Sequence, residues 1–231
     1  MTDNKGLNIV VEDVKNFLQF LSETGCTGFD CDNQSLDIIE GWGKGQAFKS
    51  ETLEEIHADL GDCNRCSLSK NRNNIVFGEG DSSARLVFVA EGPGSEEDKT
   101  GKPFVGAAGK LLTKIIQAIK LTRSQVYICN IIKCRPPNNR NPEPDEIKIC
   151  FPFLERQIVA INPEFICALG SFAAQTLLNT KTSVSKLRGK FHNYKGIKLL
   201  ATYHPAYLLR NPDKKRDVWE DMKKLMHEMG E

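Results

Sequence analysis

The sequence predicts an α/β protein, a three-layer α/β/α sandwich around a small central sheet of four parallel strands. Two observations predict this fold. Four short segments are almost continuously apolar, which is typical of strands buried on both faces. Helical patterns separate these segments, and alternating strands and helices build a parallel sheet through crossover connections. The expected strands are residues 86–90, 126–132, 165–169 and 197–201.

The helical patterns are recognised by their spacing and by their first residues. Residues 106–119 place five apolar side chains on one side, as expected for a helix that packs on a sheet. A proline followed by acidic residues at position 144 is typical of a helix start. A capping residue with early acids likewise predicts a helix that starts near Ser50. The expected helices are residues 50–62, 106–119, 144–159, 171–178 and 215–229.

Composition excludes several classes of protein. The 231 residues are 40% hydrophobic and 26% charged, which is ordinary for a soluble globular protein. No apolar run approaches the length of a transmembrane helix, so no membrane partner is expected. The start of the chain lacks a basic stretch followed by an apolar one, so we expect no signal peptide and a cytoplasmic location. A monomer is expected.

The first 50 residues differ from the rest of the chain. Residues 1–62 carry 13 acidic residues against four lysines, a net charge of −9, whereas the remainder is +10. We therefore predict an acidic N-terminal helical appendage and connector over residues 1–50, and one main domain over residues 51–231. The appendage has two candidate roles, packing on the main domain and docking a partner, and its residues do not choose between them.

A long basic segment lies in the second half of the chain. Between Phe165 and Pro212 there is no acidic residue. A one-signed stretch of this length suits a polyanion such as nucleic acid. The alternative is a solvated basic face, which charge alone slightly favours. The seven cations are Lys181, Lys186, Arg188, Lys190, Lys195, Lys198 and Arg210.

The chain has eight cysteines, which is many for a protein without an export signal. Cys63 and Cys66 form a close pair, and Cys134 and Cys150 form a wider one. Four thiolates brought together by the fold are able to hold a [4Fe–4S] cluster or a structural zinc ion, and the spacing alone does not choose between these cofactors. The other four cysteines are expected to be structural: Cys26, Cys31, Cys129 and Cys167.

Ligands of open parallel sheets bind at the carboxyl ends of the strands. After the first predicted strand comes a glycine-rich segment, Glu91-Gly92-Pro93-Gly94, followed by a second one over residues 101–106. This is not a nucleoside-triphosphate loop, because Lys102 is followed by Pro103 rather than by serine or threonine. It is not a dinucleotide fingerprint either, because the third glycine is missing.

Three further side chains lie at these strand ends, and each has an ordinary alternative role. Asn130 within the second strand is either a satisfied core amide or a group that reads a base edge. Phe104 is either core or a stacking platform for a base. His204 follows the fourth strand. A lone histidine in a loop usually has no special function, but the position of His204 at the ligand-binding edge of the sheet favours a role in the site.

Taken together, these segments resemble the uracil-DNA glycosylase superfamily, and within it the family-four, iron–sulfur enzymes. The resemblance covers roughly residues 50–230. It implies that the four cysteines Cys63, Cys66, Cys134 and Cys150 hold a [4Fe–4S] cluster. The matching segments are 51–66, 77–80, 91–94, 101–109, 130–137, Cys150, 168–170 and 204–210.

The resemblance also implies a mechanism on uracil-containing DNA, single- or double-stranded. The flipped uracil stacks on Phe104, and Asn130 binds its O4 and N3–H edge. Glu97 lies near C5, and His204 donates to O2 as negative charge develops there. Glu91 lies near the sugar and orients water or stabilises the cation; its alternative role, nearly as well supported, is to fix the loop by accepting backbone N–H groups.

The first motif departs from the family pattern. Gly92, which belongs to the implied uracil-binding set, stands where the family usually has alanine, and we expect it to loosen the loop. Some related families carry an aspartate or asparagine there that handles the attacking water. A further relative bonds covalently to uracil through a histidine after the second strand, and residues 135–149 contain no histidine.

The DNA contacts are assigned from the same resemblance and from charge. Leu208 is the candidate wedge that fills the vacated stack, and Arg210 holds either a phosphate or a local carboxylate. Lys186, Arg188 and Lys190 are expected to bind phosphates.

The predicted function is hydrolysis of the N-glycosidic bond of uracil in DNA, with release of free uracil and an abasic site. No lysine lies in the matched catalytic motifs, so a monofunctional enzyme without a lyase step is expected. Two alternatives stay open. One is an iron–sulfur or zinc protein for binding or electron transfer, and the other is a glycosylase of the same fold acting on another deaminated base.

Overall fold

The computed structural model describes Val14, Gln19, Glu23 and residues 51–230. The chain divides into two units, Met1–Lys49 and Ser50–Glu231. The N-terminal appendage lies outside the described residues except for these three helical positions, so its role stays a prediction. Among the described residues, no helix has the length and apolar character that crossing a membrane requires.

A six-stranded sheet forms the centre of the second unit, in the order β1-β3-β2-β4-β6-β5. Its four central strands are parallel and correspond to the four predicted ones. They are β2 (Leu86–Ala90), β3 (Tyr127–Asn130), β4 (Phe165–Leu169) and β6 (Ile197–Thr202). The predicted α/β class and parallel sheet are therefore confirmed.

Two short antiparallel edge strands were not predicted. β1 (Glu79–Gly80) pairs with β3, and β5 (Phe191–Tyr194) pairs with β6. β1 has only two residues, and β5 mixes polar with apolar side chains, so neither forms an apolar run. Edge strands commonly look like this because one side of each faces solvent rather than another strand.

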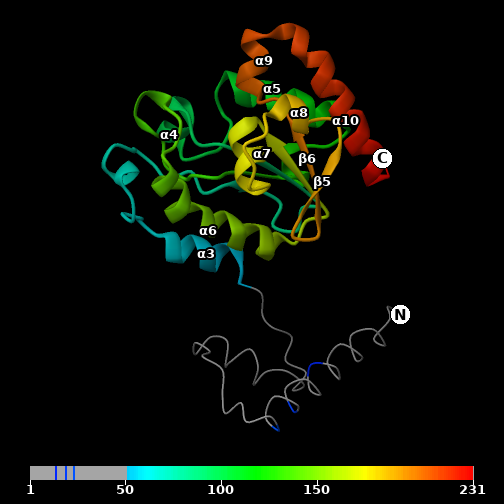
Figure 1. Cartoon of the computed structure of the whole chain (residues 1–231). Helices are drawn as coiled ribbons and strands as arrows, with labels where there is room; N and C mark the ends of the chain where they lie inside the picture. The colour runs from blue at the N-terminus through cyan, green and yellow to red at the C-terminus, as the bar shows by residue number, and fades with distance from the viewer. Residues whose placement is uncertain (1–13, 15–18, 20–22, 24–50, 231) are drawn as a thin grey trace. The chain divides into compact units, whose positions relative to one another are not determined.

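The sheet is covered on both faces, which makes the three layers. In β2, alternate residues belong to different apolar clusters: Val87 and Val89 face one layer, Phe88 and Ala90 the other. Figure 1 shows α3 and α6 on one side of the sheet and α5 and α10 on the other. The helices are α3 (Leu53–Leu60), α4 (Ser95–Thr100), α5 (Ala107–Ala118), α6 (Pro144–Ile161), α7 (Ser171–Leu177), α8 (Val184–Leu187), α9 (Pro205–Arg210) and α10 (Lys215–Met229).

The five predicted helices correspond to α3, α5, α6, α7 and α10. The capping residue of α3 is Thr52, which forms a reciprocal capping box with Glu55. The short helices α4, α8 and α9 were not predicted. α9 begins directly after His204, because Pro205 occupies its first position and the His204 side chain accepts from the Ala206 N–H. The described part of the chain also contains the 3₁₀ turns η1 (Ser67–Lys70), η2 (Arg123–Gln125), η3 (Pro137–Asn139) and η4 (Pro212–Lys214).

Candidate active site

A small cavity of about 50 Å³ lies at the carboxyl ends of the parallel strands. The segment after β2, the last residue of β3 and the residue two positions after β6 all contribute to it. It brings together all five residues that the sequence assigned to uracil. The lining residues are Gly92, Gly94, Glu97, Phe104, Ala108, Asn130 and His204.

Gly92 is held by close packing. A Cβ atom at this position would lie 2.7 Å from Cγ1 of Ile132, which is closer than side chains tolerate. Ile132 is itself fixed, because its N–H donates to the Glu91 carbonyl at 3.1 Å. The absent side chain makes room for the Ile132 side chain, and a larger residue at position 92 would require Ile132 to shift. Whether Gly92 loosens the loop stays a prediction.

Glu97 braces the walls of the cavity. Its Oε1 accepts hydrogen bonds from the Val105 and Gly106 N–H groups at 2.9 and 3.0 Å. Its Oε2 faces Gly94, where an added Cβ would lie 2.8 Å away. Glu97 thus joins the glycine-rich loop to the segment that carries Phe104. The loop-fixing role considered for Glu91 is carried out by Glu97.

Glu91 has a different environment. Its carboxylate accepts no hydrogen bond from the described residues, and burial raises its pKa. It does not line the cavity directly, although the next residue, Gly92, does. A half-buried carboxylate without a structural partner is available to water or to a developing positive charge.

Phe104 forms one flat wall of the cavity. The residue is 8% exposed, and its backbone has φ of 54°, an uncommon conformation for a non-glycine residue. Arg123 supports this turn by donating to the Pro103 carbonyl at 2.8 Å and to the Phe104 carbonyl at 3.3 Å. The Phe104 ring lies 5.6 Å from the His204 ring, centroid to centroid, at an interplanar angle of 32°. Such backbone strain is typical of positions fixed for function.

Asn130 ends β3 with an incompletely bonded side chain. It is 1% exposed, and its Oδ1 atom has no hydrogen-bond partner among the described residues. A buried oxygen without a donor costs roughly 1–3 kcal/mol, so such atoms in native proteins call for an explanation. Asn130 is one of the residues that line the cavity, so a ligand N–H group there would be in position to satisfy this acceptor.

His204 reaches the cavity from the start of α9. Its Nδ1 accepts the Ala206 N–H at 3.1 Å, so in the neutral ring the proton is on Nε2. Burial, with a smaller effect from Arg210, lowers the pKa of His204 to about 4. The imidazole is therefore neutral at pH 7 and offers one N–H donor. Gly170, missed as a site residue, makes room for it, because a Cβ there would lie 3.1 Å from the His204 Cβ.

This pKa predicts a pH-dependent loss of stability. An unfolded histidine titrates near 6.5, so at intermediate pH the unfolded state binds a proton that the folded state does not. The free energy of unfolding should thus fall by about 2 kcal/mol between pH 7 and pH 5 through His204 alone. Urea midpoints at both pH values measure this. The variant His204→Leu should lose less stability than wild type over this range, and the exposed control His227→Leu should match wild type. Equal losses in all three proteins would contradict the lowered pKa.

The four predicted metal-ligating cysteines lie on the α3–α6 side of the sheet. Cys63 and Cys66 follow α3, Cys134 follows β3, and Cys150 is in α6. Burial raises the pKa of Cys134 to about 12, and repulsion from Cys150 and Cys66 adds to this. Two N–H groups point at the sulfurs: Arg72 Nη1 lies 3.6 Å from the Cys134 Sγ, and the Lys133 N–H donates to the Cys150 Sγ at 3.3 Å.

The thiols are not gathered around a point. In the part of the chain that the structure describes, no three His, Cys, Asp or Glu side chains are arranged to hold one metal ion. The sequence did not predict that Arg72 contacts the cysteines, because no motif near it in the sequence indicates such a role. It also binds the Cys63 carbonyl and pairs with Asp62 at 2.6 Å.

Several cations of the basic segment form ion pairs within the protein, which the sequence of the segment does not indicate. Arg188 forms a two-pronged ion pair with the fully buried Asp221, at 2.9 and 3.0 Å, so its expected phosphate contact does not fit the structure. Lys195 and Lys198 pair with Glu155 and Glu228. Among the described residues, the cations of this segment without an acidic partner are Lys181, Lys186, Lys190 and Arg210.

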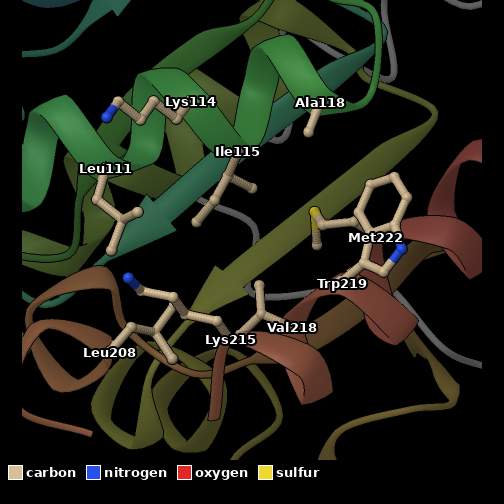
Figure 2. Close-up of a pocket in the computed structure, with 9 residues that line it drawn as sticks. All are labelled: Leu111, Lys114, Ile115, Ala118, Leu208, Lys215, Val218, Trp219 and Met222. Carbon is tan, nitrogen blue, oxygen red and sulfur yellow. The ribbon is translucent and has the colours of Figure 1, made fainter. Parts of the chain in front are cut away.

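The candidate wedge also needs correction. Leu208 is 1% exposed and lines a separate apolar groove between α5 and α10, whose volume is about 150 Å³. Figure 2 shows it among the other side chains of this groove. Its neighbour Leu209 is 46% exposed. A side chain that enters a DNA stack must project from the surface, so Leu209 fits this role and Leu208 does not. The groove has an apolar floor with Lys114 and Lys215 at its rim, and none of the five uracil-assigned residues lines it.

Comparison with known proteins agrees with this geometry. The model of the uracil DNA glycosylase superfamily matches residues 77–223, which include the whole cavity. The chain belongs to this superfamily. Within it, the chain is 47% identical to the type-4 uracil-DNA glycosylase of Thermotoga maritima, over 76% of this chain and 94% of that protein. The corresponding enzyme of Saccharolobus solfataricus is also 47% identical, over 76% of this chain and 85% of its own length.

A third type-4 uracil-DNA glycosylase, from Archaeoglobus fulgidus, is 44% identical over 76% of this chain and 92% of that protein. These relatives show that the chain is a member of the type-4 family. Cys63 and Cys66 lie before residue 77, outside the region matched by the superfamily model. Two of this chain's four candidate ligands therefore lie in a segment that this model does not cover.

Proposed function

We propose that this chain is a monofunctional uracil-DNA glycosylase that hydrolyses the N-glycosidic bond of uracil in DNA. The observation that carries this proposal is the convergence of Phe104, Asn130 and His204 on one cavity. A flat ring, an unpartnered amide oxygen and a neutral N–H donor together match the face and the two edges of a pyrimidine. The type-4 relatives support the same activity.

Recognition of uracil follows from the Asn130 amide. The base must leave the duplex to reach the cavity, at a cost of a few kcal/mol. Phe104 supports its face. The free Oδ1 accepts the N3–H of uracil, and the amide nitrogen donates to O4. Cytosine has no hydrogen on N3 and carries a donor in place of O4, so both contacts would be lost.

Bond cleavage places negative charge on uracil and positive charge on the sugar. The electron pair of the C1′–N1 bond passes to uracil, where His204 Nε2–H donates to O2. Water adds to C1′, and Glu91, whose carboxylate has no structural partner, takes the proton or stabilises the cation. A neutral imidazole suits this role because it needs to donate a hydrogen bond and not to release a proton.

The unpaired cations Lys186, Lys190 and Arg210 bind phosphates in this proposal, which makes affinity salt-dependent and independent of sequence. Arg210 has no carboxylate partner among the described residues, which favours its phosphate role. Leu209 fills the space left by the flipped base. We expect a cytoplasmic protein that acts as a monomer.

The four thiols and the type-4 relatives support a [4Fe–4S] cluster in this proposal. One zinc ion draws four sulfurs to about 2.3 Å from a single point, whereas a four-iron cluster places one thiolate on each iron and spreads them more widely. The described cysteines are close enough for their charges to influence one another. Cys63, Cys66, Cys134 and Cys150 would hold the cluster. When bound, it supplies a structural link between α3, α6 and the segment after β3.

Removing one ligand should therefore remove the cluster. We expect Cys134→Ala to lose the brown absorbance near about 400 nm and to lower the melting temperature. Cys167, buried in β4 away from the thiol group, gives the matched control Cys167→Ala, which should keep the absorbance. Absorbance spectra and iron analysis measure this. A colourless wild type with one zinc ion per chain would show that the cluster assignment is wrong.

The activity is tested by release of free uracil from an oligonucleotide that carries one uracil. Single- and double-stranded forms are compared with matched strands that carry cytosine, thymine or hypoxanthine. Release of uracil alone supports the proposal. Release of hypoxanthine in preference to uracil would identify a glycosylase for another deaminated base. No release of any base at low salt, with the cluster intact, would favour a binding or electron-transfer protein.

A further inference from the structure

A completely buried lysine lies between the thiol group and the cavity. Lys133 comes three residues after Asn130 and directly before Cys134, and its exposed fraction is 0%. No carboxylate among the described residues lies within ion-pair distance of it. Burying an ammonium group costs several kcal/mol unless its donors are bonded. The bonds that its Nζ makes therefore indicate what this lysine is for.

The Nζ atom of Lys133 donates two hydrogen bonds, to the Asn130 carbonyl at 2.8 Å and to Gln157 Oε1 at 2.5 Å. Gln157 comes from α6 and is also 0% exposed. Its amide donates to the Phe77 carbonyl at 3.0 Å and to the Tyr127 hydroxyl at 3.2 Å. The lysine thus joins the end of β3 to α6 through a buried polar network.

The Asn130 carbonyl depends on this lysine for a donor. β1 pairs only with Tyr127 and Ile128 of β3. Asn130 therefore lies beyond the end of β1, where this edge of β3 has no neighbouring strand. A carbonyl at such a place has no strand N–H to accept. The Lys133 Nζ supplies the missing donor and fixes the peptide that carries the Asn130 side chain.

The main chain of the same residue is bound to the thiol group. Its N–H donates to the Cys150 Sγ at 3.3 Å, and its carbonyl accepts the Val76 N–H at 2.8 Å. Cys150 and Gln157 are both in α6, seven residues apart, so that both anchors of Lys133 belong to one helix. A shift of the Cys150 sulfur therefore moves the residue that holds Asn130.

We propose that Lys133 is a positioning residue that sets the Asn130 amide for uracil and couples its position to the thiol group. This inference rests on the proposed function. Lys133 does not touch the base. It acts through the Asn130 carbonyl, so its effect should disappear when the Asn130 side chain is absent.

The test is a double-mutant cycle on the cluster-containing protein with Lys133→Met and Asn130→Ala. Methionine keeps the length and the buried volume but donates no hydrogen bond. We expect Lys133→Met to lower the single-turnover rate of uracil release by about 10-fold or more. Affinity for DNA with an abasic-site analogue should not change, because that DNA does not use the amide. In the Asn130→Ala background, Lys133→Met should cause no further loss. The exposed α6 variant Lys148→Met is the control and should behave as wild type.

Hydrogen exchange and cluster absorbance, measured on the same variant, separate this role from a merely structural one. In Lys133→Met, hydrogen exchange of residues 129–134 should be faster, and the cluster absorbance should be retained. If Lys133→Met is insoluble, Gln157→Met removes the second anchor and enters the same cycle. Additive losses in the cycle, or equal weakening of abasic-DNA affinity, would overturn the role of Lys133. A wild-type protein that releases no uracil would overturn the proposed function, and the exchange measurement still reports on Lys133.

Discussion

Replacing Asn130 with alanine is expected to reduce uracil release by at least about 100-fold and to remove the preference for uracil over cytosine. The physical reason is the unpartnered Oδ1 of this buried side chain. In the wild type, uracil satisfies that oxygen through N3–H, whereas cytosine leaves it bare. In Asn130→Ala the amide is absent for both bases. The enzyme therefore no longer distinguishes uracil from cytosine through this contact.

The measurement is the single-turnover release rate from matched strands that carry uracil or cytosine. Asn141→Ala, an exposed residue in the loop before α6, serves as the matched control and should leave both rates unchanged. DNA affinity should change little in Asn130→Ala, because phosphate contacts come from other residues. A variant that keeps wild-type selectivity would show that another group reads the base.

The residues of this cavity were predictable because they are tied to strand ends. Four continuous apolar runs identify the parallel strands, and the carboxyl ends of such strands meet at one edge. Asn130 and His204 are the polar residues at two of these ends, so their convergence follows from the topology. Phe104 belongs with them through its glycine-rich neighbours, which let the backbone turn and approach closely.

The sequence could not predict interactions that depend on partners far along the chain. Arg188 looks like a free cation until Asp221, 33 residues later, is packed against it. Leu208 and Leu209 are equivalent in sequence, and only the packing of α9 on α5 and α10 decides which one is buried. The sequence offered Glu91 for fixing the loop and placed Glu97 near C5 of uracil. The local helix α4 places Glu97 where it accepts the N–H groups of Val105 and Gly106.

Replacing His204 is expected to slow bond cleavage much more than DNA binding. Removing one donor to a developing negative charge typically lowers the rate by about 10²–10³-fold. His204 Nε2–H is the donor aimed at the cavity, because Nδ1 is occupied by the Ala206 N–H. His204→Ala should therefore lose about this factor in single-turnover rate. Its affinity for DNA with an abasic-site analogue should stay within a few-fold of wild type.

The pH profile separates hydrogen-bond donation from proton release. A buried imidazole with a pKa of about 4 is neutral above pH 5, so His204 itself gives the wild-type rate no inflection between pH 6 and 8. If His204 were charged in the free enzyme, the rate would fall with rising pH near 6.5 instead. The exposed control His227→Ala should keep the wild-type rate and profile. If His204→Ala kept the wild-type rate, His204 would not be the donor that stabilises the negative charge on uracil. Another group would then have to donate to O2.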